Sequence, residues 1–222
     1  GFQAGKIYNV IYEAKNPVLT GASLLSVRDI GSWLKYGGKD SPISDGVDFA
    51  YAYGISQTGR LLRSYLYFGM NLDESERRVY DGLLPHVAGG RRGDFNHRFG
   101  QPSQQSGPGF GHMFPFTDNP HDDAFQSGKS GLLDTQLSKG GMPKIIYTNT
   151  SAEYWRGDAS LAHTHPTGCC DVDFPNNVRS YLFSSTQHIP RALSRDNFPG
   201  PDGSMGSNPF NIVDFRPLLR AA

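Results

Sequence analysis

The chain has 222 residues, of which 37% are hydrophobic and 12% aromatic, and this suits a single globular domain with a sizeable core. Lys plus Arg equals Asp plus Glu at 21 each, so the composition does not favour nucleic acid or an acidic membrane surface as a partner. No apolar run is long enough to span a bilayer. Because the chain opens at Gly1 without an initiator Met, we expect a trimmed N-terminus, and a secreted or periplasmic location stays open.

Hydrophobic periodicity predicts strands that alternate with helices, which is typical of an α/β layer built on a mostly parallel sheet. The predicted strands share short runs rich in β-branched and aromatic residues and cover residues 6–14, 47–54, 78–89, 144–150 and 178–185. A strand-like turn is the alternative for 6–14, and 78–89 is expected to include a loop. The predicted helices carry apolar residues three or four positions apart and cover residues 21–37 and 58–71. The second helix is expected to end near Gly69 and Asn71, which are both good stop residues.

The stretch YAYGISQTGRLL places Ser56 between a predicted strand and a predicted helix. That context is typical of a nucleophile turn, which is usually written G-x-S-x-G. Gly54 fits the pattern, whereas Thr58 stands where the second glycine is usual and Gly59 follows one position later. Two interpretations stay open: Ser56 is a catalytic nucleophile in a variant turn, or Ser56 or Thr58 simply caps the helix.

A serine hydroxyl is a weak nucleophile unless a base, itself held by a third group, takes its proton. Glu153 follows the predicted strand that begins at Lys144, and His188 follows the last predicted strand. Both therefore lie at the carboxyl ends of parallel strands, where open α/β sheets bind ligands, and in the chain order serine, acid, histidine. Asp158 is a rival acid. The backbone N–H of Gln57, at the start of the helix, would be one oxyanion donor.

Three further residues are candidates for binding a substrate. Arg60 falls in the first turn of the helix, where a cation opposes the macrodipole. Its fork of donors suits carboxylates and sugar hydroxyls, and a structural ion pair is the alternative. Tyr154 and Trp155 flank the proposed acid, where their rings would form the wall of a pocket for sugars or aromatic acyl groups. The alternative for both rings is core packing.

The stretch 91–143 is too long for an ordinary connection and predicts a lid-like insertion within one catalytic region, 1–222. It carries aromatic residues, as the cover of an apolar pocket would. The alternative is a surface elaboration that packs on its own aromatic residues. These aromatic residues are Phe95, Phe99, Phe110, Phe114 and Phe116.

Cys169 and Cys170 are neighbours in the chain, so they cannot form a disulfide framework that closes long loops. We expect either two free thiols or a strained vicinal disulfide. The cysteines and histidines do not have the spacing of a zinc site. A metal site that combines His163 and His165 with nearby aspartates is a weak alternative, and the other histidines are expected to brace loops or lie at the surface. The nearby aspartates are Asp171 and Asp173. The other histidines are His86, His97, His112 and His121.

Several long motifs, in one order, carry a resemblance to a known family. They are GISQTGRLLRSYLYFGMN, YDGLLPHVAGGRRGDFNHRFGQPS, PFTDNP, PKIIYTNTSAEYWRGDASLAHTHPTG and NNVRSYLFSSTQH. From about Phe2 to His188, the chain resembles the alpha/beta hydrolase domain family of serine esterases. The resemblance implies an α/β-hydrolase fold with Ser56 as nucleophile, Glu153 as acid and His188 as base. The family has the same S-Q-x-G-R turn, so the displaced glycine no longer argues against Ser56.

The turn is also similar, more weakly, to that of glucuronoyl esterases, in which a serine, two residues and a glycine precede a basic residue that contacts a uronic acid. Arg60 occupies the matching position, which points to a sugar-acid ester. Gln57 stands where those esterases carry an arginine, and this departure leaves the substrate undecided. Against the family pattern, the chain is expected to lack the early strands and most of the last helix. Without those strands, the serine would be positioned but poorly activated.

The sequence therefore predicts a serine hydrolase that cleaves carboxylic esters through an acyl-enzyme, with no cofactor and no metal. The expected partner is a small-molecule or carbohydrate ester, with no nucleic acid and no membrane, and the oligomeric state stays open. Alternatives are an acyltransferase or a peptidase on the same residues, and a catalytically silent binding module with the hydrolase fold. A metal-dependent hydrolase is the weakest alternative.

Overall fold

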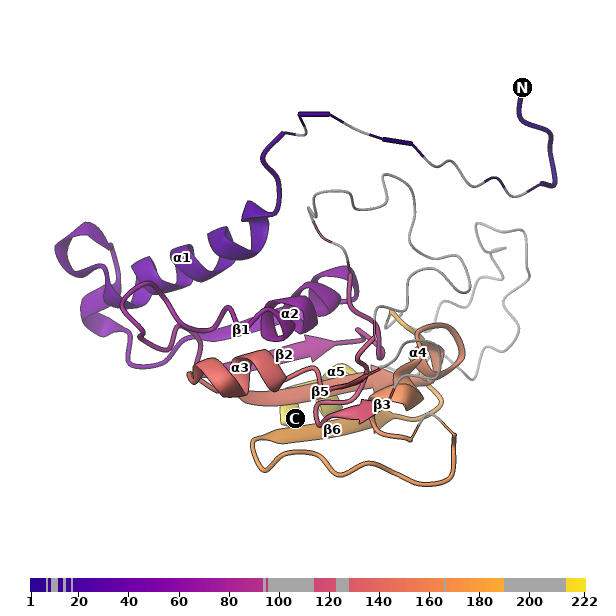
Figure 1. Cartoon of the computed structure of the whole chain (residues 1–222). Coiled ribbons are helices and arrows are strands. Elements are labelled where there is room, and N and C mark those ends of the chain that lie inside the picture. The colour runs from indigo at the N-terminus through magenta and orange to yellow at the C-terminus, as the bar shows by residue number, and fades with distance from the viewer. Residues whose placement is uncertain are drawn as a thin grey trace, which may run out of the picture.

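Figure 1 presents a computed structural model of the chain, in which a sheet lies beside several helices. The structure describes residues 1–222 except 7, 9–11, 14, 17, 94, 96–113, 123–127, 166 and 190–214. Among the helices of the described part, none is both long enough and apolar enough to cross a membrane.

The central sheet has four strands in the order β1-β2-β5-β6, and every neighbouring pair is parallel. These strands are β1 Tyr51–Ile55, β2 Gly82–His86, β5 Lys144–Thr150 and β6 Val178–Phe183. Ile55 is opposite His86, His86 is opposite Thr148, and Thr150 is opposite Phe183. The carboxyl ends of the strands therefore lie along one edge of the sheet, and the segments that follow β1, β5 and β6 begin there.

Helices and a small second sheet complete the described structure. The α-helices are α1 Ala22–Tyr36, α2 Gln57–Tyr67, α3 Asp134–Lys139, α4 Ser151–Arg156 and α5 Arg216–Ala221. The short 3-10 helices are η1 Gly38–Asp40, η2 Ser44–Gly46 and η3 Ala159–Ala162. The second sheet is an antiparallel pair formed by β3 His121–Asp122 and β4 Lys129–Ser130.

Helix α2 buries its apolar side chains on one face of the main sheet. Leu62 and Leu66 recur at helical spacing and are buried in one cluster with Leu83 of β2 and Ile145 of β5. Burying a leucine side chain fully stabilises a fold by about 1.5–3 kcal/mol. This packing fixes α2, and with it the turn that precedes the helix, relative to the sheet.

The opposite face of the sheet carries the last described segment. Side chains alternate between faces along a strand, so His86 lies on the face opposite Leu83. The ring of Phe215 lies against His86, with centroids 5.4 Å apart, and stacks on Phe183 at 5.5 Å. Phe215 directly precedes α5, which Figure 1 shows behind the sheet, away from α1 and α2.

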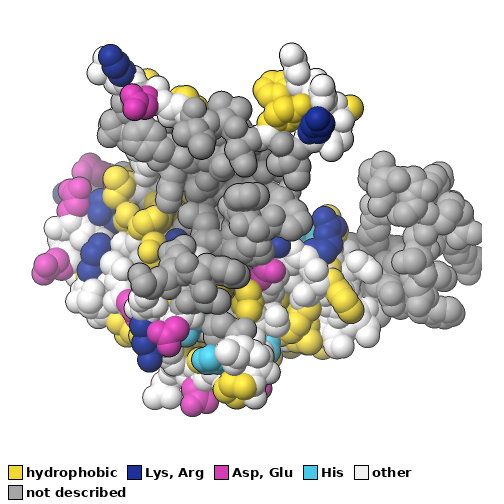
Figure 2. Space-filling model, turned by 45° about the vertical axis from the view of Figure 1, so that its right-hand side comes forward, with side chains coloured by type: hydrophobic (Ala, Val, Ile, Leu, Met, Phe, Trp, Pro, Cys, Tyr) yellow, Lys and Arg dark blue, Asp and Glu magenta, His cyan; other side chains and the backbone are white. Residues whose placement is uncertain are grey.

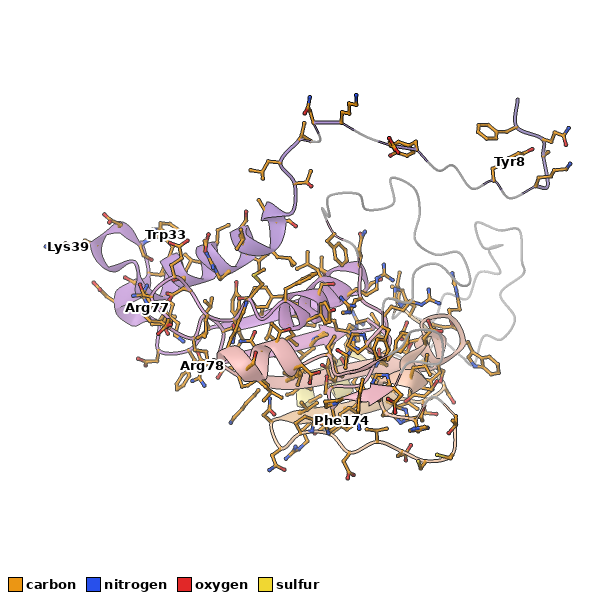
Figure 3. All side chains as sticks on the ribbon, viewed as in Figure 1. Tyr8, Trp33, Lys39, Arg77, Arg78 and Phe174 are labelled. Atoms are coloured by element: carbon orange, nitrogen blue, oxygen red, sulfur yellow. The ribbon has the colours of Figure 1, made fainter. Side chains whose placement is uncertain are left out.

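A buried ion pair anchors the C-terminal end of α1 to the segment before β2. Lys35 Nζ lies 2.6 Å from Asp81 Oδ2, and both side chains are less than a tenth exposed. The same carboxylate oxygen accepts the backbone N–H of Ala50 at 2.9 Å, just before β1. Figure 3 shows Arg78, which binds the other oxygen of Asp81 at 2.8 Å, near this end of α1.

Charged side chains are mixed over the surface. Figure 2 shows basic and acidic side chains interspersed with hydrophobic ones on one face of the molecule. This mixture agrees with the equal numbers of basic and acidic residues in the chain.

The prediction of a strand over 6–14 is wrong for the residues that the structure describes there. Lys6, Tyr8, Tyr12 and Glu13 lie outside any strand. Tyr8 instead accepts the backbone N–H of Gln3 at 2.7 Å, and Figure 3 shows it far from the sheet. Alternation of apolar and polar residues produces a strand only where a neighbouring strand supplies hydrogen bonds, and no described strand lies beside these four residues.

The other predicted elements form, and most of them have shorter bounds than predicted: β6 ends at Phe183 rather than 185, and α2 ends at Tyr67. β1 begins at Tyr51 rather than at 47, and β2 covers only Gly82–His86 of the predicted 78–89. β1 lies at an edge of the sheet, and no described strand pairs with its outer side. Tyr51 and Tyr53 are accordingly 71% and 53% exposed.

The described part of the stretch 91–143 is folded rather than one long loop. It contains α3, β3 and β4, and Leu132 and Leu133 are fully buried in the core cluster. Phe114 and Phe116 lie against His121, so they pack within their own segment. Phe99 and Phe110 lie outside the described residues, and a lid over the site stays a prediction.

Candidate active site

Ser56 lies in a strained turn between β1 and α2. Its φ and ψ are 55° and −111°, a backbone conformation that residues other than glycine rarely adopt. Two backbone hydrogen bonds hold it there: the N–H of Ser56 donates to the carbonyl of His86 at 2.8 Å, and its carbonyl accepts the N–H of Arg60 at 3.0 Å. The turn therefore projects the serine side chain at the carboxyl edge of the sheet, where a nucleophile would be exposed.

The displaced glycine has a steric explanation. A Cβ atom on Gly59 would lie 2.9 Å from the carbonyl oxygen of His86, and one on Gly54 would lie 2.5 Å from the carbonyl oxygen of Thr58. Both glycines therefore let the helix approach the strands closely. The hydroxyl of Thr58 accepts the N–H of Ile55 at 2.8 Å and donates to its carbonyl at 2.9 Å, so threonine closes the turn where a glycine is usual.

His188 joins Ser56 to Glu153. Nε2 of His188 lies 2.9 Å from Oγ of Ser56, and its Nδ1 lies 2.5 Å from Oε1 of Glu153. With Nδ1 protonated, the imidazole donates to the carboxylate and accepts from the serine hydroxyl. The side chain of Ser56 makes no cap bond to α2, so the capping interpretation finds no support.

Glu153 is held by the segment that precedes it. Its carboxylate oxygen Oε2 accepts the N–H of Thr150 at 2.7 Å and the hydroxyl of Thr150, in a capping box that begins α4. Glu153 is 4% exposed. Burial alone would raise the pKa of the carboxyl, but the hydrogen bonds from His188 and Thr150 outweigh burial, and the pKa lies below its ordinary value. Glu153 is therefore an anion that orients the imidazole at neutral pH.

His86, the last residue of β2, lies next to the site and holds the backbone of Ser56. It is 3% exposed, and its Nδ1 lies 2.8 Å from the hydroxyl of Thr148. Burial lowers the pKa of His86 to about 4, against the opposing effect of the Glu153 charge. This histidine is therefore neutral at pH 7, and its backbone carbonyl fixes Ser56.

Gln57 begins α2, directly after the serine. The first N–H groups of a helix have no intrahelical acceptor, and the helix dipole favours negative charge there. The position suits an oxyanion donor.

Asp158, the rival acid, is engaged elsewhere. Its Oδ2 lies 2.6 Å from Nε of Arg91. The contacts described for His188 lead to Ser56 and Glu153 and do not include Asp158.

Arg60 lies in the first turn of α2, four residues after Ser56. It makes no ion pair within the described part of the chain, and its Nε is buried without a hydrogen-bond partner there. Burial and then the charge of Arg91 lower the pKa of Arg60. The structural ion pair that the sequence left open does not occur among the described residues.

Tyr154 and Trp155 follow Glu153 in α4 and point to different surroundings. The hydroxyl of Tyr154 lies 2.6 Å from Nε2 of His163, whose Nδ1 lies 3.3 Å from Asp171. Trp155 is 88% exposed, which excludes core packing for this ring.

No metal site forms within the part of the chain that the structure describes, where no three metal-binding side chains gather. His163 is held by Tyr154, His165 by Thr167, and His121 by Thr117. His97 and His112 lie outside the described residues.

Sequence reasoning missed three residues that hold the site. Thr150 was recognisable, because T-S-A-E at 150–153 is the signature of a capping box. Thr58 and His86 act through a local turn and a backbone carbonyl, for which the sequence carries no comparable signal.

The chain belongs to the alpha/beta hydrolase domain family, whose model matches residues 11–222. This match and the parallel sheet confirm the predicted α/β-hydrolase fold, and membership indicates a hydrolase-type function. No curated protein and no solved structure matches the chain, so the likeness to glucuronoyl esterases is unsupported.

Proposed function

We propose that the chain is a serine esterase, which cleaves carboxylic esters through an acyl-enzyme on Ser56, His188 and Glu153. The observation that carries the proposal is the continuous contact from serine to imidazole to buried carboxylate, at 2.9 and 2.5 Å. The strained backbone of Ser56 adds support, because such strain gathers at functional sites.

In the proposed reaction, His188 Nε2 takes the proton of Ser56 as the serine oxygen attacks the ester carbonyl. Glu153 stabilises the imidazolium that forms and keeps the proton on Nδ1. The imidazolium then gives its proton to the leaving alcohol, which leaves an acyl group on Ser56. Water attacks this acyl-enzyme by the same proton transfers, which restores the serine.

Charge develops on the carbonyl oxygen during both attacks. The N–H of Gln57 is the proposed donor to this oxyanion, with the positive end of the α2 dipole behind it.

The proposed substrate is a small-molecule or carbohydrate ester, with either a sugar acid or an aromatic acyl group. Arg60 supports the sugar acid, since an arginine one turn from the serine, with no carboxylate partner among the described residues, suits a carboxylate or sugar hydroxyls. The exposed ring of Trp155 supports stacking with either group. An acyltransferase would use the same steps with an alcohol or amine in place of water.

Labelling with a fluorophosphonate tests the proposal, because the probe modifies only an activated serine. We expect one adduct per chain on Ser56, and its loss in Ser56→Ala. Ser138→Ala is the matched control, since Ser138 is an exposed serine whose hydroxyl donates to the carbonyl of Thr135 in its own helix turn. A well-folded chain that gives no adduct would refute the proposal and favour a silent binding module.

A further inference from the structure

The neighbouring cysteines lie on a fixed hairpin. Thr164 and Asp171 face each other in an antiparallel bridge. Within it, the N–H of His165 donates to the carbonyl of Cys170 at 2.9 Å, and the N–H of Gly168 donates to the carbonyl of His165 at 2.7 Å. Gly168 has a φ of 71°, which lets the chain reverse. The short loop is therefore closed by its own backbone.

Side chains also fix the base of this hairpin. His163 precedes the bridge and Asp171 closes it, and the two side chains are 3.3 Å apart. The other ring nitrogen of His163 lies 2.6 Å from the hydroxyl of Tyr154 in α4. The hairpin thus presents its loop from an anchored base.

The two thiols are in contact and open to solvent. The Sγ atoms of Cys169 and Cys170 are 2.8 Å apart, and both residues are exposed, free cysteines. The hydrogen bond from Cys170, and then one from Thr167, lower the pKa of Cys169. The pKa of Cys170 is raised, because its proton is held in the bond to Cys169. Cys169 is therefore the better nucleophile of the two.

We propose that Cys169 and Cys170 form a reversible thiol–disulfide site that reacts with small disulfides of the glutathione type. The Cys169 thiolate attacks one sulfur of the small disulfide and forms a mixed disulfide, and the first small thiol leaves. Cys170 loses its proton to solvent and attacks the sulfur of Cys169, which expels the second small thiol. The protein loses two hydrogen atoms, and one small disulfide becomes two thiols.

The bond formed is strained and therefore easily reduced. The peptide bond between the cysteines is trans, which fixes their Cα atoms about 3.8 Å apart. Disulfides usually span roughly 4.4–6.8 Å between Cα atoms, and shorter spans store strain. Strained, exposed disulfides belong to the labile and regulatory kind. The disulfide is thus readily reopened by reduced glutathione, and the oxidation is reversible.

The test incubates the full chain with mixtures of oxidised and reduced glutathione, followed by alkylation and mass analysis of the peptide with both cysteines. We expect the oxidised peptide to be two hydrogen atoms lighter and to return to the dithiol as reduced glutathione is added. Cys170→Ser is expected to retain one glutathione on Cys169. Cys169→Ser should form its adduct at least about threefold more slowly, because less thiolate is present.

A glycine inserted between the cysteines separates their Cα atoms and tests the strain. Its disulfide should need at least about tenfold more reduced glutathione to open. If the wild-type disulfide and the disulfide of the insertion variant resist reduction equally, the wild-type bond is not strained. A wild-type peptide that stays unreacted, retains glutathione without closing, or forms only dimers between chains would overturn the proposal. The mass of the wild-type peptide tests the proposal even where a variant misfolds.

Discussion

Nε2 of His188 lies 2.9 Å from Oγ of Ser56, although 132 positions separate the two residues in the chain. The serine follows β1 and the histidine follows β6, which are the two outer strands of the main sheet. Neighbouring strands are about 4.8 Å apart, so three spacings separate these strands by about 14 Å. The segment after β6 must therefore reach back along the carboxyl edge, and the contact depends on an assembled sheet.

Removing the charge of Glu153 should disable the imidazole while preserving the fold. Glu153→Gln keeps the size of the side chain and an oxygen for Thr150, but its amide no longer fixes the His188 tautomer. We expect ester turnover to fall by about a thousandfold to ten-thousandfold. The measurement is kcat/KM on a simple nitrophenyl ester, with circular dichroism to verify folding.

Asp158→Asn is the matched control for this change, because it removes the rival carboxylate, which lies against Arg91. This variant should keep most of the activity. An equal loss in both variants would count against Glu153 as the specific acid.

Glu153 also links stability to pH. Its folded-state pKa lies below the ordinary value of 4.5, so the unfolded chain binds the proton first as the pH falls. The stabilisation from this group is complete above the unfolded pKa and is lost as the pH falls through the folded pKa. Wild type should therefore lose its advantage over Glu153→Gln in the free energy of unfolding below pH 4.5. Urea unfolding of both proteins, at neutral pH and in steps below that value, measures the gap, and a constant gap would contradict the linkage.

The positions of Ser56, Glu153 and His188 after three strands were predictable, because parallel strands place their carboxyl ends on one edge. The displaced glycine was harder to interpret. Only the structure shows that Gly59 faces the carbonyl of His86 and that Thr58 closes the turn. The approach of Gly59 to His86 joins segments far apart in the chain, so local pattern does not predict it.

The segment 6–14 is a case in which the sequence predicts a strand that the structure does not contain. Its alternation has the period of a strand, but whether a partner strand lies beside it is a property of the fold. Within the long stretch 91–143, Leu132 and Leu133 pack into the core, which the sequence did not predict. Buried leucines followed by a one-and-a-half-turn helix give too short a periodic signal for sequence reasoning.

A side chain at Gly59 should push α2 away from the sheet. The Cβ atom of Gly59→Ala would lie 2.9 Å from a backbone carbonyl, which cannot move without disturbing β2. We expect the free energy of unfolding to fall by about 1–3 kcal/mol, with a loss of fluorophosphonate labelling at Ser56. Gly46→Ala is the control, because its Cβ would meet nothing within 4 Å. If thermal unfolding gives Gly59→Ala and Gly46→Ala the same stability, the close approach of α2 to β2 is unimportant.

Arg60 should distinguish anionic from neutral esters. Arg60→Gln is expected to lower kcat/KM for a uronate methyl ester by about tenfold or more, since a hydrogen bond to a charged group contributes about 1.5–3 kcal/mol. A neutral nitrophenyl ester should be affected far less. Arg156→Gln removes the same charge at an exposed position of α4 and should leave the ratio between the two esters unchanged. A parallel loss on both esters would assign Arg60 to the scaffold.

Trp155 should contribute to binding rather than to chemistry. Its ring is 88% exposed beside the proposed acid, so Trp155→Ala removes a stacking surface without opening a cavity. Ring stacking is worth about 0.5–1.5 kcal/mol, so KM for a sugar-acid or aromatic ester should rise by roughly twofold to tenfold, with a smaller change in kcat. Trp33→Phe changes the other tryptophan, on α1, and should leave both constants as they are. A fall in kcat at constant KM would mean that Trp155 supports the geometry of Glu153, because the loss would then arise only in the transition state.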